Sequence, residues 1–265
     1  MTRQKQALQI VPRLFALLLG FALAGGLCLG QPREIRVAAA ADLNFAMREL
    51  AQQFEKQSGC SVSVSYGSSG NFFSQLQNGA PFDIFLSADV AYPQKLRAAE
   101  LTQGDMYEYA VGRLVLWAPA NSEVSPDAQH WDALVDPRVT KIAIANPEHA
   151  PYGRAAVAAL KSAGIYDRIK SKLVYGENIS QAAQFVQSGN AQAGILALSL
   201  TLAPSMHGGK SWEIPRDLYP PIRQGAAILN KARNPEDARR FLDFLKSAEA
   251  RETLRAFGFS PPASN

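Results

Sequence analysis

Residues 61–79 read SVSVSYGSSGNFFSQLQNG, and this stretch decides which fold the chain can adopt. It contains a short β-rich run, then small hydroxyl residues between Gly67 and Gly70, and then a helical pattern. Glycine permits close approach of the backbone, and a serine at a helix start satisfies free amides. Such amides also favour negative charge. The stretch therefore predicts a strand, a tight corner and a helix, with a candidate anion site at the corner.

The same order of a β-rich run, a small-residue loop and a helical pattern occurs in three further segments. These segments are residues 35–59, 141–164 and 172–189, and in the second of them the helical pattern RAAVAALKSAG starts at Arg154. Strands that alternate with helices of this length indicate parallel β-α-β units. In such sheets, ligands bind beyond the carboxyl ends of the strands, where the following helices begin. The four loops are therefore candidates for one shared site.

Two other segments indicate that the chain forms two lobes. The apolar run YAVGRLVLWAPA at residues 109–120 suits a buried strand, and PPIRQGAAILN at residues 220–230 offers a later one. The helical pattern at residues 234–259 should pack back on the first lobe, with Asn234 as the helix cap. We predict a two-lobed α/β fold in which each lobe is a mixed, mainly parallel sheet flanked by helices. Lobe I comprises residues 31–112 and 223–265, lobe II comprises residues 113–222, and a hinge joins them.

The first 30 residues have the layout of a secretory signal peptide. Arg3, Lys5 and Arg13 are followed by an uncharged apolar run. This run is shorter than a membrane span, which needs about 20 apolar residues. We expect cleavage near Gly30, with residues 22–24 as an earlier alternative, and a periplasmic product. Lipidation of Cys28 is a further alternative, although Leu27 precedes it where that motif requires a small residue.

Composition excludes some classes of protein. The chain has 265 residues, 47% of them hydrophobic and 19% charged, as is usual for a globular protein. Removal of the signal peptide lowers the formal charge from +4 to +1, with 24 basic against 23 acidic residues. This balance gives no argument for a nucleic-acid partner. Cys60 is then the one remaining cysteine, so an internal disulfide cannot form, and we expect a semi-buried thiol near a strand start.

Motifs for catalysis are missing from the sequence. The segment HGGKS at 207–211 resembles the end of a phosphate-binding loop, but Pro204 stands where that motif requires glycine. His130, His149 and His207 are widely separated and do not pair with cysteine at metal-ligand spacing. Without a nucleophile and base pair, we expect a binding protein that needs no cofactor and no free metal cation. A secreted enzyme on the same fold stays open as the alternative.

Each helix-entry residue also has an ordinary structural explanation. Asp42 and Ser69 could cap their own helices, Tyr152 could be a turn aromatic, and Ile179 could precede a cap. Four such corners in one exported two-lobed chain nevertheless favour a shared site for a small anion.

Residues 33–260 resemble the periplasmic molybdate-binding proteins of ABC importers, which have the type II solute-binding fold. The segments that carry the resemblance are VAAAADLNFAMRELAQQF, GSSGNFFSQLQNGAPFDIFLSAD, YAVGRLVLWAP, IANPEHAPYGRAA, NISQAAQFVQSGNAQAGILALS and FLDFLKSAEARETLRAFGF. The family's fold is two α/β lobes that close by a hinge over a tetrahedral oxyanion. The resemblance implies a molybdate ligand, with tungstate as a second ligand, a membrane ABC permease as partner, and a monomer.

Carried over by position, the resemblance implies five ligand-binding residues. These are Ala41, Asp42, Ser69, Tyr152 and Ile179. Some relatives add a tyrosine at the position of Ala197, so that contact is absent here. Recognition would rest on neutral donors and helix N-termini, each with about half a positive charge.

Asp42 departs from the family pattern, which presents Ser, Thr or Asn at this position. An ionised carboxylate would repel a buried dianion. We expect the Asp42 carboxylate to point away and cap its own helix. Two alternatives are a carboxyl group that the bound anion keeps protonated, and a ligand that keeps a proton, such as hydrogen phosphate or arsenate.

Overall fold

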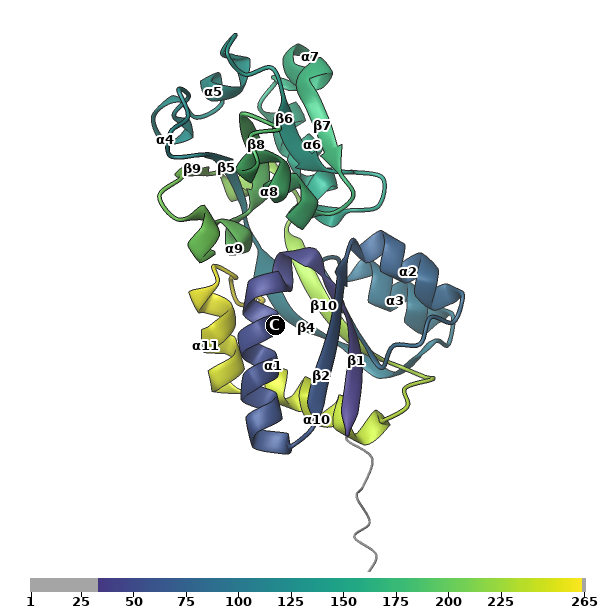
Figure 1. Cartoon of the computed structure of the whole chain (residues 1–265). Helices are drawn as coiled ribbons and strands as arrows, with labels where there is room; N and C mark the ends of the chain where they lie inside the picture. Colours follow the sequence, from purple (N-terminus) through teal and green to yellow (C-terminus); the bar gives the residue numbers. More distant parts are fainter. Residues whose placement is uncertain (1–32, 264–265) are drawn as a thin grey trace, which may run out of the picture. The chain divides into compact units, whose positions relative to one another are not determined.

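The structure is a computed structural model that describes residues 33–263. The predicted signal peptide and the lipidation alternative at Cys28 lie outside the described residues. Within them, the strands form two five-stranded sheets, which lie in two separate lobes in Figure 1. The predicted fold class is confirmed, since each sheet is mixed and has helices packed against it.

The sheet of lobe I has the strand order β2-β1-β3-β10-β4. Strand β1 pairs in parallel with β2 and β3, whereas β10 is antiparallel to β3 and β4. The strands are β1 Glu34–Ala40, β2 Ser61–Gly67, β3 Ile84–Ser87, β4 Thr102–Gly112 and β10 Ile222–Leu229. The helices are η1 Ala41–Leu43, α1 Asn44–Ser58, α2 Ser69–Gln77, α3 Ala91–Ala98, α10 Pro235–Leu245 and α11 Ala248–Ala256.

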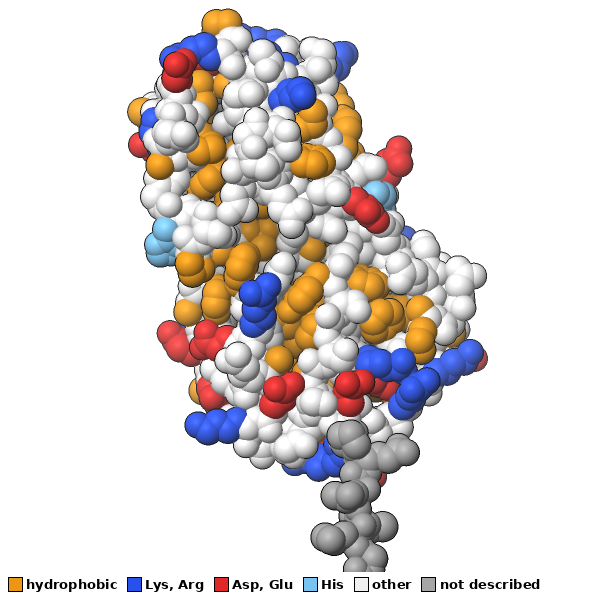
Figure 2. All heavy atoms as spheres, viewed as in Figure 1, with side chains coloured by type: hydrophobic (Ala, Val, Ile, Leu, Met, Phe, Trp, Pro, Cys, Tyr) orange, Lys and Arg blue, Asp and Glu red, His pale blue; other side chains and the backbone are white. Residues whose placement is uncertain are grey.

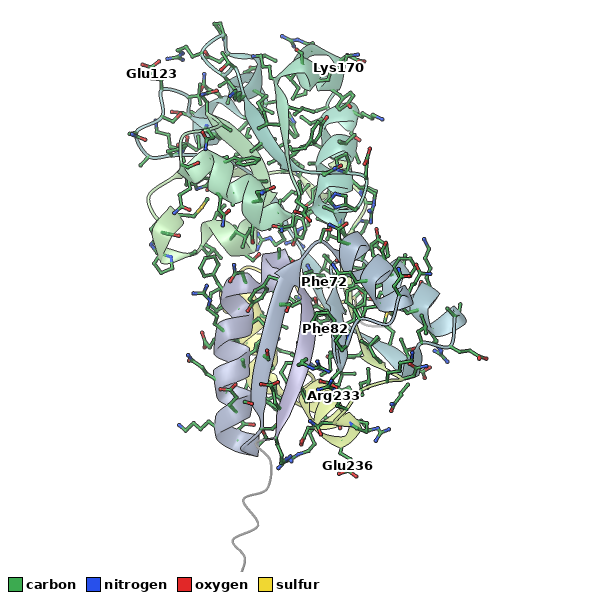
Figure 3. All side chains as sticks on the ribbon, turned by 45° about the vertical axis from the view of Figure 1, so that its right-hand side comes forward. Phe72, Phe82, Glu123, Lys170, Arg233 and Glu236 are labelled. Carbon is green, nitrogen blue, oxygen red and sulfur yellow. The ribbon has the colours of Figure 1, made fainter. Side chains whose placement is uncertain are left out.

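Helices cover both faces of the lobe I sheet because its central strands, β1, β3 and β10, are mainly apolar on both sides. Successive side chains of a strand point to opposite faces. Val37 accordingly belongs to the core beneath α1, α10 and α11, and Ala38 to the core beneath α2 and α3. Phe72 and Phe82, labelled in Figure 3, meet edge to face in the second core, with ring centroids 5.6 Å apart.

The sheet of lobe II has the order β7-β6-β8-β5-β9, with β6 parallel to β7 and β8 and with β5 antiparallel to β8 and β9. The strands are β5 Leu114–Ala118, β6 Ile142–Ala145, β7 Leu173–Gly176, β8 Ala193–Ala197 and β9 Lys210–Glu213. The α-helices are α4 Pro126–Gln129, α5 Asp132–Val135, α6 Pro151–Ser162, α7 Tyr166–Ile169, α8 Ile179–Gln187 and α9 Leu198–Thr201. The short 3-10 turns are η2 Lys170–Lys172, η3 Pro204–Met206 and η4 Arg216–Leu218.

The apolar run at residues 109–120 is two strands rather than one. It is divided at Arg113, so that its first half ends β4 in lobe I and its second half forms β5 in lobe II. The chain returns to lobe I at β10, which pairs along its length with β4. These two passages are the places where the chain crosses between the sheets, as Figure 1 shows.

The four predicted β-α-β units are all present. One difference concerns the third unit, whose helix α6 begins at Pro151 and not at Arg154 as the sequence pattern suggested. Proline is favoured in the first turn of a helix, where no amide hydrogen is needed. Tyr152 therefore lies in the first helical turn and not in a preceding loop.

Candidate functional site

A small cavity lies where the four helix-entry corners meet. Its volume is about 200 Å³, counting all the space between the lining atoms. The residues that line it are Ala40, Ala41, Asp42, Gly67, Ser68, Ser69, Ala88, Ala150, Pro151, Tyr152, Asn178 and Ile179. All five predicted site residues are therefore brought together, from both lobes. Asp42 is the one charged residue in this lining, which contains no lysine or arginine.

Ser69 is the first residue of α2, at the corner between Gly67 and Gly70. It is completely buried, and its Oγ accepts a hydrogen bond of 2.9 Å from the amide of Ala88. The cap of α2 is Ser68, whose Oγ accepts from the amide of Asn71, so the capping explanation of Ser69 is wrong. The Ser69 hydroxyl hydrogen is consequently available to a ligand.

Tyr152 projects from the first turn of α6 in lobe II toward lobe I. It is 2% exposed, and its hydroxyl donates a hydrogen bond of 2.9 Å to Oδ2 of Asp42. A side chain at Gly112 would overlap this hydroxyl, which explains a glycine at the end of β4. The turn-aromatic explanation of Tyr152 is therefore wrong.

Ile179 is the first residue of α8, and Asn178 caps this helix by accepting from the amide of Gln181 at 3.0 Å. Helix α8 also contacts lobe I, because the Ser180 hydroxyl donates to the carbonyl oxygen of Ala41 at 2.9 Å. The amides in the first turn of a helix have no acceptor within it. Ser69, Tyr152 and Ile179 thus each present a first-turn amide beside the cavity.

The expectation that Asp42 caps its own helix is wrong. Asp42 lies inside the turn η1, and neither the N-cap of η1, Ala40, nor that of α1, Leu43, has a side-chain capping bond. The carboxylate is instead turned inward, with 1% of the residue exposed. Its Oδ2 accepts from Tyr152 and, at 2.5 Å, from Nε2 of Gln224. Its Oδ1 is the one buried side-chain nitrogen or oxygen in residues 33–263 without a hydrogen-bond partner.

The buried position alters the protonation of this group. Burial raises the pKa of Asp42 to about 6, and the hydrogen bonds from Gln224 and Tyr152, with smaller contributions from the backbone amides of Asp42 and Leu43, offset only part of this effect. Burial together with the Asp42 charge raises the pKa of the Tyr152 hydroxyl well above its usual value. Tyr152 is therefore a neutral donor near pH 7, while Asp42 is close to the pH at which it changes charge.

Gln224 is a site residue that the sequence analysis missed. It lies on β10, is completely buried, and also donates to the Tyr152 hydroxyl at 3.3 Å. The Tyr109 hydroxyl donates to Oε1 of Gln224 at 2.7 Å, so Nε2 is the end that faces Asp42. The available signal was a lone amide in the strand IRQGAAIL, which is apolar apart from Gln224 and the exposed Arg223, because a buried polar side chain requires partners.

Further contacts join the two lobes around the cavity. The Gly70 amide donates to the His149 carbonyl at 2.9 Å, and Nδ1 of His149 lies 2.9 Å from Oγ of Ser68. On another side, Arg154 of α6 forms an ion pair of 2.6 Å with Asp89. On the face drawn in Figure 2, charged side chains gather mainly at the ends of the lobes away from this junction.

Two other kinds of feature are absent from the described part of the chain. Residues 33–263 contain no cluster of histidine, cysteine and acidic side chains that could hold a metal ion. The same residues form no helix with the length and apolar character of a membrane span. Cys60 is completely buried rather than semi-buried, and burial raises the pKa of its thiol to about 11.

Comparison with known proteins identifies the family. A family model described as bacterial extracellular solute-binding protein matches residues 35–260. The chain belongs to this family. Among its relatives, the molybdate-binding protein ModA of Azotobacter vinelandii is 43% identical over 90% of this chain and 95% of the relative. The ModA protein of Rhodobacter capsulatus is 36% identical over 98% of this chain and 99% of the relative.

Solved structures agree with the family assignment. The periplasmic molybdate-binding protein of Azotobacter vinelandii superposes with a TM-score of 0.81 at 32% identity, over 86% of this chain and 99% of that one. The sulfate-binding protein SubI of Mycobacterium tuberculosis has a TM-score of 0.69 at 15% identity over 87% and 88% of the two chains. This second likeness shows the fold alone. The solute-binding fold is thus shared with proteins named for different tetrahedral oxyanions.

Proposed function

We propose that this protein binds molybdate, and also tungstate, in the cavity between its lobes and delivers the ion to a membrane ABC permease. The observation that carries the proposal is the meeting of Ala41, Asp42, Ser69, Tyr152 and Ile179 around one small cavity. Relatives at 43% and 36% identity are named molybdate-binding proteins, which supports molybdate over other oxyanions.

The size and polarity of the cavity favour a small ion over an organic ligand. Pockets for drug-sized molecules measure roughly 300–1,000 Å³, whereas the space that a water molecule could enter in this cavity is only about 10 Å³. The first-turn amides of three helices and the Ser69 hydroxyl are neutral donors on its wall. Helix N-termini carry a partial positive charge, so they can hold an anion without a lysine or arginine.

The binding cycle follows from the contributions of the two lobes. Ala41, Asp42 and Ser69 belong to lobe I, whereas Tyr152 and Ile179 belong to lobe II. An anion held by both sets of donors binds the closed arrangement better than an open one, and only such differential affinity can shift the lobes. We propose that two bodies move relative to each other in this cycle. One comprises residues 31–112 and 223–265, and the other comprises residues 113–222.

The cellular setting is part of the proposal. The chain would be exported by the signal peptide at residues 1–30 and would act in the periplasm as a monomer without a nucleic-acid partner. A binding role, rather than catalysis, is supported by the names of the relatives and by a site whose donors are mainly amides and hydroxyl groups.

Calorimetry on protein purified from the periplasm tests this function directly. Molybdate and tungstate should bind with one ion per chain and more tightly than sulfate, phosphate or arsenate. An equal or stronger response to one of the other anions would overturn the choice of ligand. A parallel turnover assay with phosphate and sulfate esters should give no product, and repeated turnover would establish an enzyme instead.

A further inference from the structure

Asp42 is the feature that the proposed function does not explain. Its Oδ2 accepts hydrogen bonds from Tyr152 and Gln224, whereas its Oδ1 has no partner although the residue is 1% exposed. Buried polar atoms are almost always hydrogen-bonded, so an unpartnered oxygen on a residue that lines a cavity requires an explanation. A donor supplied by the ligand, or a proton on Oδ1 itself, would provide one.

The surroundings of Asp42 fix its orientation without neutralising its charge. Tyr109 holds the amide group of Gln224, and Gln224 in turn bonds both Asp42 and the Tyr152 hydroxyl. The two direct partners of the carboxylate come from β10 and α6, and Tyr109 of β4 supports one of them, so the carboxylate is held from two directions. All of them are uncharged, and the cavity lining supplies no lysine or arginine.

A dianion beside this carboxylate would meet a full like charge in a buried place. The repulsion between such charges at contact distance exceeds the net contribution of a single hydrogen bond. A proton between the two groups removes one negative charge and also gives Oδ1 its missing partner. The same change converts the most unfavourable contact in the site into a hydrogen bond with a charged acceptor.

We propose that Asp42 couples binding of the oxyanion to uptake of a proton, an inference that rests on the proposed function. The site takes a tetrahedral dianion together with one proton, which is held between Oδ1 of Asp42 and an oxygen of the anion. The proton comes from solvent when the ligand is fully deprotonated, as molybdate, tungstate and sulfate are near neutral pH. A ligand that already carries this additional proton, such as dihydrogen phosphate, brings its own.

Other titratable groups near Asp42 do not give the same dependence. The pKa of the buried hydroxyls of Tyr109 and Tyr152 is raised, so both stay neutral near pH 7. Helices α8 and α9, which also pack on the turn of Asp42, carry no titratable side chain. The neighbouring elements also carry Tyr66 on β2 and Arg48 on α1, which bonds Asn44. Arg154 on α6 is paired with Asp89, and Arg223 on β10 is paired with Glu108. His149, beside Ser68, is the group that must be separated experimentally.

The test measures affinity and proton uptake on the full exported protein. Molybdate at micromolar concentration is titrated into the protein at several pH values from 6 to 8. Each titration is repeated in buffers that differ in ionisation enthalpy. For a carboxyl group that titrates near pH 6 and must be protonated in the complex, Kd should rise about 50-fold between these limits. About one proton should be taken up per molybdate or sulfate near pH 8.

Two variants separate Asp42 from the other groups. In Asp42→Asn, an amide nitrogen donates to the anion in place of the shared proton, so Kd should be flat with pH and proton uptake should vanish. In His149→Gln the pH dependence of the wild-type protein should persist. A slope that disappears in His149→Gln, and not in Asp42→Asn, would overturn the proposal.

The inference and the proposed function fail in different ways. Tight molybdate binding by the wild-type protein with a flat pH profile and no proton uptake would overturn the inference and leave the function intact. Failure of the wild-type protein to bind molybdate, tungstate, sulfate or phosphate at any pH would overturn both. The uptake measured on the wild-type protein decides the matter even where Asp42→Asn does not fold.

Discussion

The amide of Ala88 donates a hydrogen bond of 2.9 Å to Oγ of Ser69, and this bond fixes the direction of the serine hydroxyl hydrogen. Because the oxygen already accepts from the backbone, its own hydrogen is left to donate into the cavity that Ser69 lines. One side chain thus connects the loop after β3 to the start of α2 and presents a neutral donor to the site.

Replacement of Ser69 by alanine should weaken both binding and folding. Loss of the donor should reduce the affinity for molybdate by about 1–3 kcal/mol, and the buried Ala88 amide loses its partner at a further cost of about 1–3 kcal/mol in unfolding free energy. Calorimetry and urea denaturation measure the two effects separately. Ser74→Ala, at an exposed position of the same helix, is the matched control and should change neither quantity.

Replacement of Tyr152 by phenylalanine should weaken closure of the lobes. The hydroxyl donates to Asp42 across the two lobes, so its loss should reduce molybdate affinity by about 1–2 kcal/mol. The same hydrogen bond lowers the pKa of Asp42, and its removal should move the pH dependence of binding to higher pH. Tyr175→Phe, at a residue that is 47% exposed, should behave as wild type. Unchanged affinity in Tyr152→Phe would show that the hydroxyl does not contribute to the closed state.

The pH dependence of stability without ligand should reveal Asp42 directly. Burial raises its pKa from 3.8 to about 6, so the folded protein binds more protons than the unfolded chain between these values. The contribution of Asp42 to stability is therefore greatest below pH 4, falls as the pH rises to about 6, and is constant above, with a loss of about 3 kcal/mol. Asp42→Asn should remove this loss, so that its advantage over wild type in urea grows from pH 4 to pH 7. An advantage of equal size at both pH values would contradict a raised pKa.

The fold and the cavity wall could be predicted because both depend on local patterns. The start of each unit combines a β-rich run with small residues and a helix, and parallel sheets bring such starts to one edge. Ala41, Ser69, Tyr152 and Ile179 all follow from this rule and from the family resemblance, and they line the same cavity.

The role of Asp42 could not be predicted in this way, because its partners lie far away in the sequence. Tyr152 is 110 residues and Gln224 is 182 residues from it. A preference of aspartate for helix caps is a local property, and tertiary hydrogen bonds override it here. The sequence pattern also places the start of α6 three residues late, because a proline in the first turn extends the helix backward.

The approach of Gly70 to His149 provides a test of whether closure of the lobes is needed for binding. The Gly70 amide donates to the His149 carbonyl at 2.9 Å, and a Cβ added at Gly70 would lie 2.6 Å from that oxygen. The atoms of His149 that such a Cβ would meet are the carbonyl oxygen, Cα and Cβ, and none of them moves when the side chain turns, so the clash cannot be relieved in that way. Gly70→Ala should therefore keep the lobes apart and reduce molybdate affinity by about tenfold or more, which corresponds to about 1.4 kcal/mol. Small-angle scattering with and without molybdate should show compaction of the wild-type protein and less compaction of the variant. Alanine is a better helix former than glycine, so α2 itself should not be weakened. Wild-type affinity in Gly70→Ala would mean that the anion is held by one lobe, and the division of donors between two lobes would lose its role.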